Sequence, residues 1–176
     1  MNKKLLALTL ALVLALSLAA CGGKNDKAPD APAETEKTAD LGAFYASLTE
    51  GDKWPALMNL TEDESMAEML ESYYPGLSEI PTKQCGVYIA AITSAVGELA
   101  LVEVENAEDV EKVEAIFQAR IDYQVGDDAN PGGAWYPETI EGWKNQSKIA
   151  SHGNYVMLAV GEQAEAAVEA FEALFA

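Results

Sequence analysis

Residues 148–175, KIASHGNYVMLAVGEQAEAAVEAFEALF, contain the pattern that decides the fold of this 176-residue chain. A short extended run from Lys148 to Ser151 is followed by a turn at His152–Gly153–Asn154 and by the apolar run Tyr155–Val160. Two extended runs separated by a short glycine-containing break predict an antiparallel hairpin. Between Glu162 and Phe175 the apolar residues recur at helical spacing, which predicts a helix after the hairpin.

The same order of elements occurs once before in the chain. Cys85–Thr93 and Leu99–Val104 are apolar runs separated by a turn at Ser94–Gly97, and they predict another hairpin. The segment Val110–Ile121, which includes Arg120, follows the helical period and is expected to end near residues 123–126. Two strand–strand–helix units predict an α+β domain in which an antiparallel sheet is packed with helices.

Two helices are expected before the first hairpin. Asp40 is placed to cap a short helix, because apolar residues between Leu41 and Leu48 follow at the spacing i, i+3, i+4, i+7. Thr61–Glu64 has the form of a capping box. The apolar residues of Met66–Tyr74 then predict a second helix, which Pro75–Gly76 would stop.

The first residues have the features of an export signal. Met1–Lys4 is positively charged, and Leu5–Leu18 is an uncharged apolar run too short for a comfortable membrane span. The following segment, Leu18-Ala-Ala-Cys21-Gly, resembles the lipobox of bacterial lipoproteins. That resemblance implies cleavage after residue 20, diacylglyceryl transfer to the Cys21 thiol, and a lipid anchor in the cell membrane facing outside the cytoplasm.

The lipobox defines three parts of the chain: a signal peptide (1–20), a lipidated Cys21 with a disordered tether (21–39), and one α+β domain (40–176). Residues 24–39 contain Ala, Pro, Lys, Asp, Glu and Thr with almost no large apolar side chain, so they cannot bury enough surface to fold. A flexible tether of this length has a root-mean-square span of about 20 to 25 Å. The domain can therefore lie clear of the bilayer.

The composition excludes several partners. The chain has 29 acidic and 11 basic residues and a net charge of −18. Removal of the signal, which contains Lys3 and Lys4, makes the mature chain two charges more negative. Nucleic acid and anionic lipid headgroups are repelled by such a surface, so attachment to the bilayer must depend on the lipid at Cys21.

The candidate ligand-binding residues are Trp135, Tyr136 and Trp143. They lie in or beside a loop, Gly126–Ala134, that is rich in Gly, Pro, Asn and Asp, and a short helix is expected from Pro137 to about residue 145. Exposed aromatic rings in such a loop can stack on a sugar or a peptide. The alternative is that these rings pack the loop and the helix onto the core.

The residues offer no recognisable catalytic or metal site, and no cofactor is expected. His152 is the single histidine and is expected to be a polar residue at an exposed turn, whereas Cys85 is expected to be an inert core thiol. The acidic groups Glu62-Asp63-Glu64 and Asp127-Asp128 lack the ligand spacing of a calcium loop and are better explained by helix capping and loop solubility. A hydrolase would need a cleft lined by carboxylates, and no pair of acids is singled out by sequence.

The strands suggest another way to act. Val87–Ile92, Leu99–Val102 and Tyr155–Val160 are apolar at consecutive positions, so both faces of the sheet need cover. The two early helices can supply it. Without them, an apolar sheet face would remain for self-association or for a partner in a cell-envelope assembly.

The domain also resembles a known family. The segments that carry the resemblance are Tyr136-Pro-Glu, Ile149–Val160 with its Gly-Asn-Tyr-Val turn, Glu98–Val104 and Asn106–Val113. They are similar to the bacterial lipoprotein family built on domain of unknown function 4358, which implies a small surface domain without known catalytic residues. The tether, the missing catalytic set and the aromatic loop together predict a non-catalytic module that binds a protein or a cell-wall ligand outside the cytoplasmic membrane.

Overall fold

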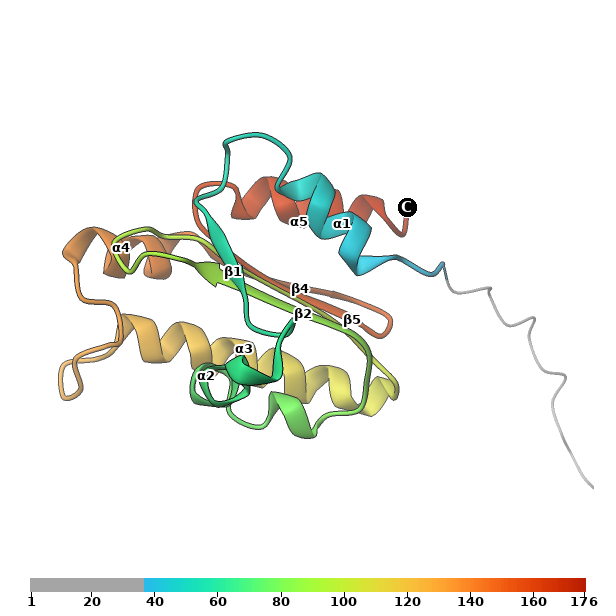
Figure 1. Cartoon of the computed structure of the whole chain (residues 1–176), viewed down its shortest axis with the longest axis horizontal. Helices are drawn as coiled ribbons and strands as arrows, with labels where there is room; N and C mark the ends of the chain where they lie inside the picture. The colour runs from blue at the N-terminus through green and yellow to red at the C-terminus, as the bar shows by residue number, and fades with distance from the viewer. Residues whose placement is uncertain (1–36) are drawn as a thin grey trace, which may run out of the picture. The chain divides into compact units, whose positions relative to one another are not determined.

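A five-stranded antiparallel sheet forms the centre of the computed structural model, which describes residues 37–176 (Figure 1). The order of its strands is β1-β2-β3-β5-β4. The strands are β1 (Leu57–Asn59), β2 (Thr82–Ala90), β3 (Glu98–Val104), β4 (Ser147–His152) and β5 (Tyr155–Val160). The predicted signal peptide, Cys21 and most of the predicted tether lie outside the described residues.

Five α-helices accompany the sheet. They are α1 (Leu41–Leu48), α2 (Ala67–Tyr73), α3 (Val110–Val125), α4 (Pro137–Asn145) and α5 (Ala164–Ala173), and single 3₁₀ turns lie at Glu64–Met66, Leu77–Glu79 and Ala107–Asp109. The two hairpins β2–β3 and β4–β5 are each followed by a helix, and α1 and α2 precede them. The predicted α+β fold with two strand–strand–helix units is confirmed.

The hairpins join side by side at the middle of the sheet. Strand β3 pairs with β5 in a register that runs from Glu98 opposite Val160 to Glu103 opposite Tyr155. All four strand pairs are antiparallel. The β2–β3 turn and the start of β4 therefore lie at one end of the sheet, and the β4–β5 turn lies at the other.

The alternation of side chains along each strand divides the core into two layers. On one face of β3, Ala100 and Val102 pack with residues of α3, while on the other face Leu99 and Leu101 pack with residues of α1 and α5. Figure 1 shows α1 and α5 together on one side of the sheet and α2 and α3 on the other. All residues of β3 and β5 are therefore buried within the monomer, whereas Ile92, at the end of the predicted apolar run Val87–Ile92, is 62 % exposed.

Two boundaries differ from the sequence-based prediction. Strand β2 runs from Thr82 to Ala90 rather than from Cys85 to Thr93, because its pairing with β3 continues past an irregularity between Thr82 and Gln84. The three-residue β1 was not predicted. It pairs with the end of β2, and a strand this short has too few residues to show a period.

Of the two helix caps predicted before the first hairpin, one is confirmed and the other is wrong. Asp40 caps α1 as predicted, since its Oδ1 accepts a hydrogen bond from the Ala43 N–H at 2.9 Å. The capping box at Thr61–Glu64 was wrong. The Thr61 hydroxyl donates to Asn59 at the end of β1, and Asp63 instead caps the following 3₁₀ turn by accepting from the Ser65 N–H.

Candidate functional site

A buried ion pair lies beside the end of the sheet where β3 begins. The Arg120 Nε and Nη2 atoms donate to the two carboxylate oxygens of Glu98 at 2.8 and 2.9 Å. Arg120 is 4 % exposed and Glu98 is 2 % exposed. This two-pronged geometry satisfies much of the hydrogen-bonding capacity of both groups and makes a buried pair tolerable.

Aromatic side chains surround the pair. The buried Tyr74 donates its hydroxyl to Glu98, and burial is the main reason why the pKa of Tyr74 lies well above its usual value. The Arg120 guanidinium carbon lies 4.4 Å from the ring centre of Tyr73 and 5.1 Å from that of Trp143. These rings stabilise the cation through their faces and exclude water from it.

A cavity of about 240 Å³ opens next to this cluster. Its walls are formed by residues from α2, the end of β2, the β2–β3 turn, the start of β3, α3, the 126–136 loop and α4. They include Tyr73, Ile89, Arg120, Gln124, Trp135 and Trp143. We call this space the Arg120 cavity.

Two buried polar atoms, in residues that line this cavity, lack partners. Within residues 37–176, neither Arg120 Nη1 nor Gln124 Oε1 has a hydrogen-bond partner, although both atoms are buried. One is a donor and the other is an acceptor. The two residues are four apart on α3, so they lie on the same face of the helix. Neither atom has surface open to solvent or to the cavity, so the cavity is defined by the other lining groups, above all the exposed Trp135.

The loop that forms the rim is held against the end of α3. The Gly133 N–H donates to the Tyr123 carbonyl at 2.7 Å, and the Ala134 N–H donates to the Gln124 carbonyl at 3.2 Å. A Cβ at position 133 would lie 2.4 Å from the Tyr123 ring and 2.7 Å from Gln124 Oε1, so a larger residue here would have to displace both side chains. This close approach brings Trp135, two residues later, to the rim.

The three predicted ligand-binding residues have different environments. Trp135 is 86 % exposed at the rim, whereas Trp143 is 5 % exposed and packs in the core on the face of the sheet covered by α3. Both line the Arg120 cavity. Tyr136 is 48 % exposed, precedes α4 as its N-cap residue and does not line that cavity. Packing onto the core, the alternative reading of these rings, therefore applies to Trp143, while Trp135 is available for stacking.

The sequence-based prediction missed Glu98, Arg120 and Tyr74. Arg120 was recognised as part of a helix, but its partner is 22 positions away and the pairing depends on the sheet. One feature of the sequence does point to it. Arg120 follows Val113 and Phe117 at helical spacing on a buried face, and a charge in that position requires a buried partner.

Neither His152 nor Cys85 lines the Arg120 cavity. His152 lies at the end of β4, and its ring stacks on Phe175 with centroids 4.3 Å apart. Cys85 is partly buried in β2, and burial raises the pKa of its thiol to about 11. Among residues 37–176, no group of three or more His, Cys, Asp or Glu side chains could hold a metal ion.

The predicted acidic groups have local structural roles. Asp127 Oδ1 accepts from the backbone N–H groups of Ala129 and Asn130, and these bonds lower the pKa of its carboxyl. A larger hollow of about 470 Å³ lies between α4 and the turn before α5, and its acids Glu138, Glu141 and Glu162 are exposed. It is not lined by the exposed Trp135, so the Arg120 cavity remains the better candidate.

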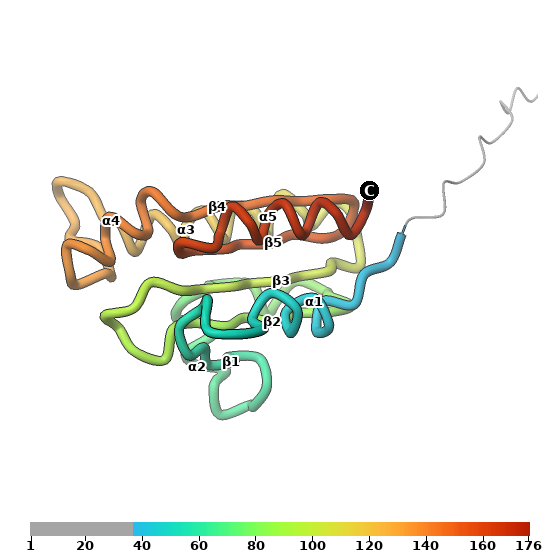
Figure 2. The backbone as a smooth tube through the Cα atoms, turned by 90° about the horizontal axis from the view of Figure 1, so that it is seen from above, coloured from blue at the N-terminus to red at the C-terminus, as the bar shows by residue number. Residues whose placement is uncertain are grey.

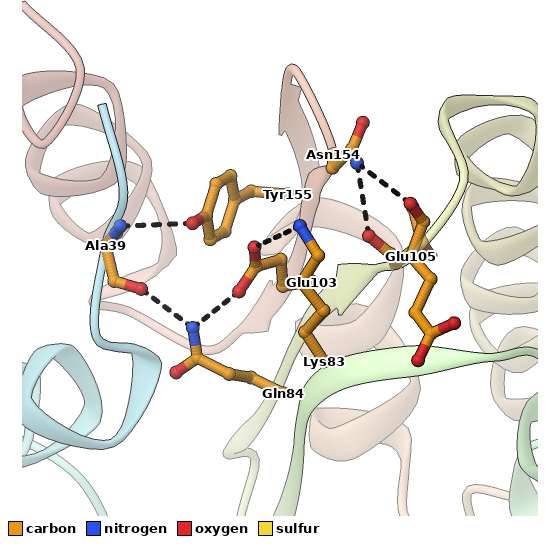
Figure 3. Close-up of polar contacts among 8 residues, drawn as sticks. Ala39, Lys83, Gln84, Glu103, Glu105, Asn154 and Tyr155 are labelled. Carbon is orange, nitrogen blue, oxygen red and sulfur yellow. Dashed lines mark hydrogen bonds and ion pairs between the residues drawn. The ribbon is translucent and has the colours of Figure 1, made fainter. Parts of the chain in front are cut away.

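The first described residues are attached near the other end of the sheet. Tyr155 accepts a hydrogen bond from the Ala39 N–H, and Gln84 donates to both the Ala39 carbonyl and Glu103 (Figure 3). Gln84 also accepts from the Leu41 N–H at 2.9 Å. Burial opposes ionisation of Glu103, but hydrogen bonds from Gln84 and Lys83 outweigh it and lower the pKa of the carboxyl. We call this group the Gln84 clasp; it holds Ala39, which was assigned to the tether.

The comparisons with known proteins identify one family. The family model described as Domain of unknown function (DUF4358) matches residues 56–161. This range includes all five strands and the helices α2, α3 and α4, but neither α1 nor α5. No curated protein and no solved structure matches the chain. In the part of the chain that the structure describes, no helix is both long and apolar enough to cross a membrane.

Proposed function

This chain belongs to the family of domain of unknown function 4358, and we propose that it is an exported lipoprotein that binds a ligand outside the cytoplasmic membrane without catalysing a reaction. The lipid anchor is at Cys21, at the end of the signal-like segment. The binding site is the Arg120 cavity, with Trp135 at its rim. Trp143 supports the site from the core.

The observation that carries the proposal is the combination of an exposed aromatic ring and a buried ion pair in the lining of one cavity. Trp135 offers a largely exposed ring at the rim, and the buried Arg120 and Glu98 lie in the wall. Cavities that combine apolar walls with a few convergent polar groups are typical of small-molecule sites. No described residue in the cavity forms a nucleophile–base pair, which favours binding over catalysis.

The position of the tether fits this function. Ala39 is held near the first residues of β2, whereas the cavity contacts the last residues of the same strand. Nine residues of strand span about 30 Å. Figures 1 and 2 both show residues 37–40 at one end of the domain and the 126–136 loop with α4 at the other. An anchor at Cys21 therefore leaves the cavity free to face away from the bilayer.

Photo-crosslinking in intact cells tests the proposal. A photoreactive amino acid replaces Trp135 in one strain and the exposed Glu172 of α5 in a control strain. We expect an adduct of a protein, a glycan or a smaller molecule from position 135 that is absent from position 172. The same adducts from both positions, or none from position 135, would contradict a binding site at this rim.

A further inference from the structure

We infer that the Arg120 cavity is the docking site for a basic segment of a partner protein, which places one aromatic or aliphatic side chain among Ile92, Tyr123 and Trp135. We call these three side chains the Trp135 rim. The inference rests on the proposed binding function and specifies its ligand. It follows from the gathering of exposed apolar side chains, the size of the cavity and the charge of the elements that form its walls.

The exposed apolar side chains of the domain gather at this cavity. Among the described residues, the large hydrophobic side chains that are exposed are those of Ile92, Tyr123, Trp135 and Tyr136. The first three line the Arg120 cavity, although they come from the β2–β3 turn, α3 and the 126–136 loop. Single exposed apolar residues are ordinary, but a group drawn from separate elements is typical of an interaction site.

Backbone hydrogen bonds hold the Trp135 rim in place. The bond from the Gly133 N–H to the Tyr123 carbonyl ties the loop that contains Trp135 to the end of α3. In the β2–β3 turn, the Ala95 N–H donates to the Ile92 carbonyl at 3.1 Å. A rim that is ordered before binding loses little conformational entropy when a partner docks, which favours affinity.

The size of the cavity favours a single side chain as its occupant. A volume of about 240 Å³ is below the roughly 300–1,000 Å³ of pockets for drug-sized ligands. In protein–protein interfaces, an anchoring side chain fills a pocket near the centre, and tryptophan and tyrosine are enriched among the residues that contribute most of the affinity. Trp135 and Tyr123 are 86 % and 63 % exposed, so they are available to pack around such an anchor. A protein therefore fits this site better than a small molecule.

The elements that form the walls determine the charge of the partner. Between Arg120 and Lys144 the chain contains five acidic residues and no lysine or arginine. The five are all exposed: Asp122, Asp127, Asp128, Glu138 and Glu141. Helix α2 also contains exposed acids, Glu68 and Glu71, and no basic residue. Because the charge of Arg120 is balanced by Glu98, lysine or arginine beside the anchor complements this end of the domain and accelerates encounter.

The same charges disfavour other occupants. A second copy of this chain would bring a second set of acids to the interface, and each chain has a net charge of −18. Anionic glycans and lipid headgroups meet the same repulsion. A neutral glycan can stack on Trp135, but its binding gains nothing from these charges and would not respond to salt.

Selection of peptides tests the chemistry of the partner. The full-length protein in detergent micelles is exposed to a phage-displayed library of random short peptides, and the variant Trp135→Ala is the counter-selection target. We expect the peptides that bind the protein but not the variant to share one aromatic or large aliphatic residue flanked by lysine or arginine. Neutral or acidic peptides in this set, or no peptide that depends on Trp135, would overturn the inference.

A second variant locates the binding independently of the selection. The strongest selected peptide is synthesised with a fluorophore and titrated by fluorescence anisotropy. Ile92→Ala, in a different element from Trp135, should weaken binding by about tenfold or more without lowering the melting temperature, because the side chain is exposed. Tyr136→Ala is the matched control, since this exposed neighbour of Trp135 does not line the cavity and its loss should leave the affinity unchanged. Equal losses from both variants would contradict an anchor in the cavity.

Two pairs of neutralised acids test the charge argument. Asp128→Asn with Glu138→Gln removes two negative charges from the wall elements, whereas Glu169→Gln with Glu172→Gln removes two from α5. The first pair should weaken binding of the peptide by about three- to tenfold at low salt and by less at high salt, and the second pair should have a smaller effect. Equal effects would mean that only the overall charge attracts the peptide, and docking at this end would be wrong.

The outcomes separate the class of the partner from the binding function. If no peptide depends on Trp135 while the crosslinker at position 135 captures a glycan or a small molecule in cells, the inference fails and the proposed binding function survives. If position 135 captures a protein, its crosslinked segment must be basic and must compete with the selected peptide; an acidic segment overturns the inference. If neither method detects a ligand, both fail.

Discussion

Arg120 and Glu98 carry opposite charges at a depth where water cannot solvate them. Replacing such a pair by apolar residues is often neutral, but removing one partner leaves an uncompensated charge in a low-dielectric core. Tyr74 adds a third member, because its hydroxyl donates to the same carboxylate. The pair therefore sets the geometry of the cavity wall more than it adds net stability.

The variant Glu98→Gln tests the cost of the unbalanced charge. It should lower the free energy of unfolding by about 3 to 5 kcal/mol, measured by urea denaturation. As a control, Glu165→Gln removes the exposed ion pair with Lys148, whose charged atoms are 2.8 Å apart, and should cost no more than about 1 kcal/mol. The double variant Glu98→Leu with Arg120→Met should recover most of the loss. A similar small effect from Glu98→Gln and Glu165→Gln would show that Arg120 is solvated after all.

Cys85 gives a prediction about reactivity and pH. Because burial raises the pKa of its thiol from 9.0 to about 11, the thiolate fraction at pH 8 should be about a hundredfold below that of an unshifted thiol. In the variant Cys21→Ser, Ellman's reagent should therefore react slowly with the folded protein and rapidly in urea. A raised pKa in the folded state also means that this group stabilises the fold fully below pH 9 and that the contribution is lost as the pH rises towards 11. Equal rates in the two states would contradict the burial of the thiol.

The loop 126–136 and the helix α1 are held in place by contacts to other elements, because neither is long or regular enough to be stable alone. The loop lies on the end of α3 through the backbone bonds of Gly133 and Ala134. Helix α1 has only eight residues, too few to be stable alone, and depends on packing and on the Gln84 clasp. The order of both elements therefore depends on the tertiary contacts that position them.

The variant Gln84→Ala tests the clasp. It removes the hydrogen bonds that Gln84 donates to Ala39 and Glu103, which Figure 3 shows, and the bond that Gln84 accepts from the Leu41 N–H. Hydrogen exchange at the amides of α1 should accelerate by about tenfold or more, while exchange in β3 and β5 should change little. Asn154→Ala is the matched control, because Asn154 lies at the same end but donates to Val104 and Glu105. Unchanged exchange in α1 after loss of Gln84 would mean that packing alone holds the helix.

At the scale of the whole molecule, an acidic domain is joined to a proposed lipid attachment point at Cys21. A net charge of −18 gives no attraction to anionic lipid, so membrane association should depend on one covalent modification. The variant Cys21→Ser should lose incorporation of radiolabelled palmitate and move from the membrane fraction to the soluble fraction, with an unchanged circular dichroism spectrum. Retention in the membrane after loss of the label would contradict a lipid anchor at this residue.

Much of the architecture could be predicted because local sequence carries local periods. The run Tyr155–Val160 matches β5, and Pro137 begins α4 as expected from its missing N–H and restricted φ. The strands and helices alternate in an order that allows few α+β arrangements. The missed β1 and the wrong capping box at Thr61 have a common cause, since both depend on where residue 59 pairs across the sheet.

The sequence by itself determined the class of the fold, the acidity and the presence of aromatic residues near the 126–136 loop, and it predicts an export segment that ends at Cys21. Only the tertiary structure decided which of those rings is available: Trp135 is at a rim and Trp143 is in the core. It also brought Glu98 to Arg120 and left one donor and one acceptor unpartnered among the described residues. The physical reason is that periodicity reports which face of an element is buried, whereas a pairing between distant side chains depends on how the elements pack against one another.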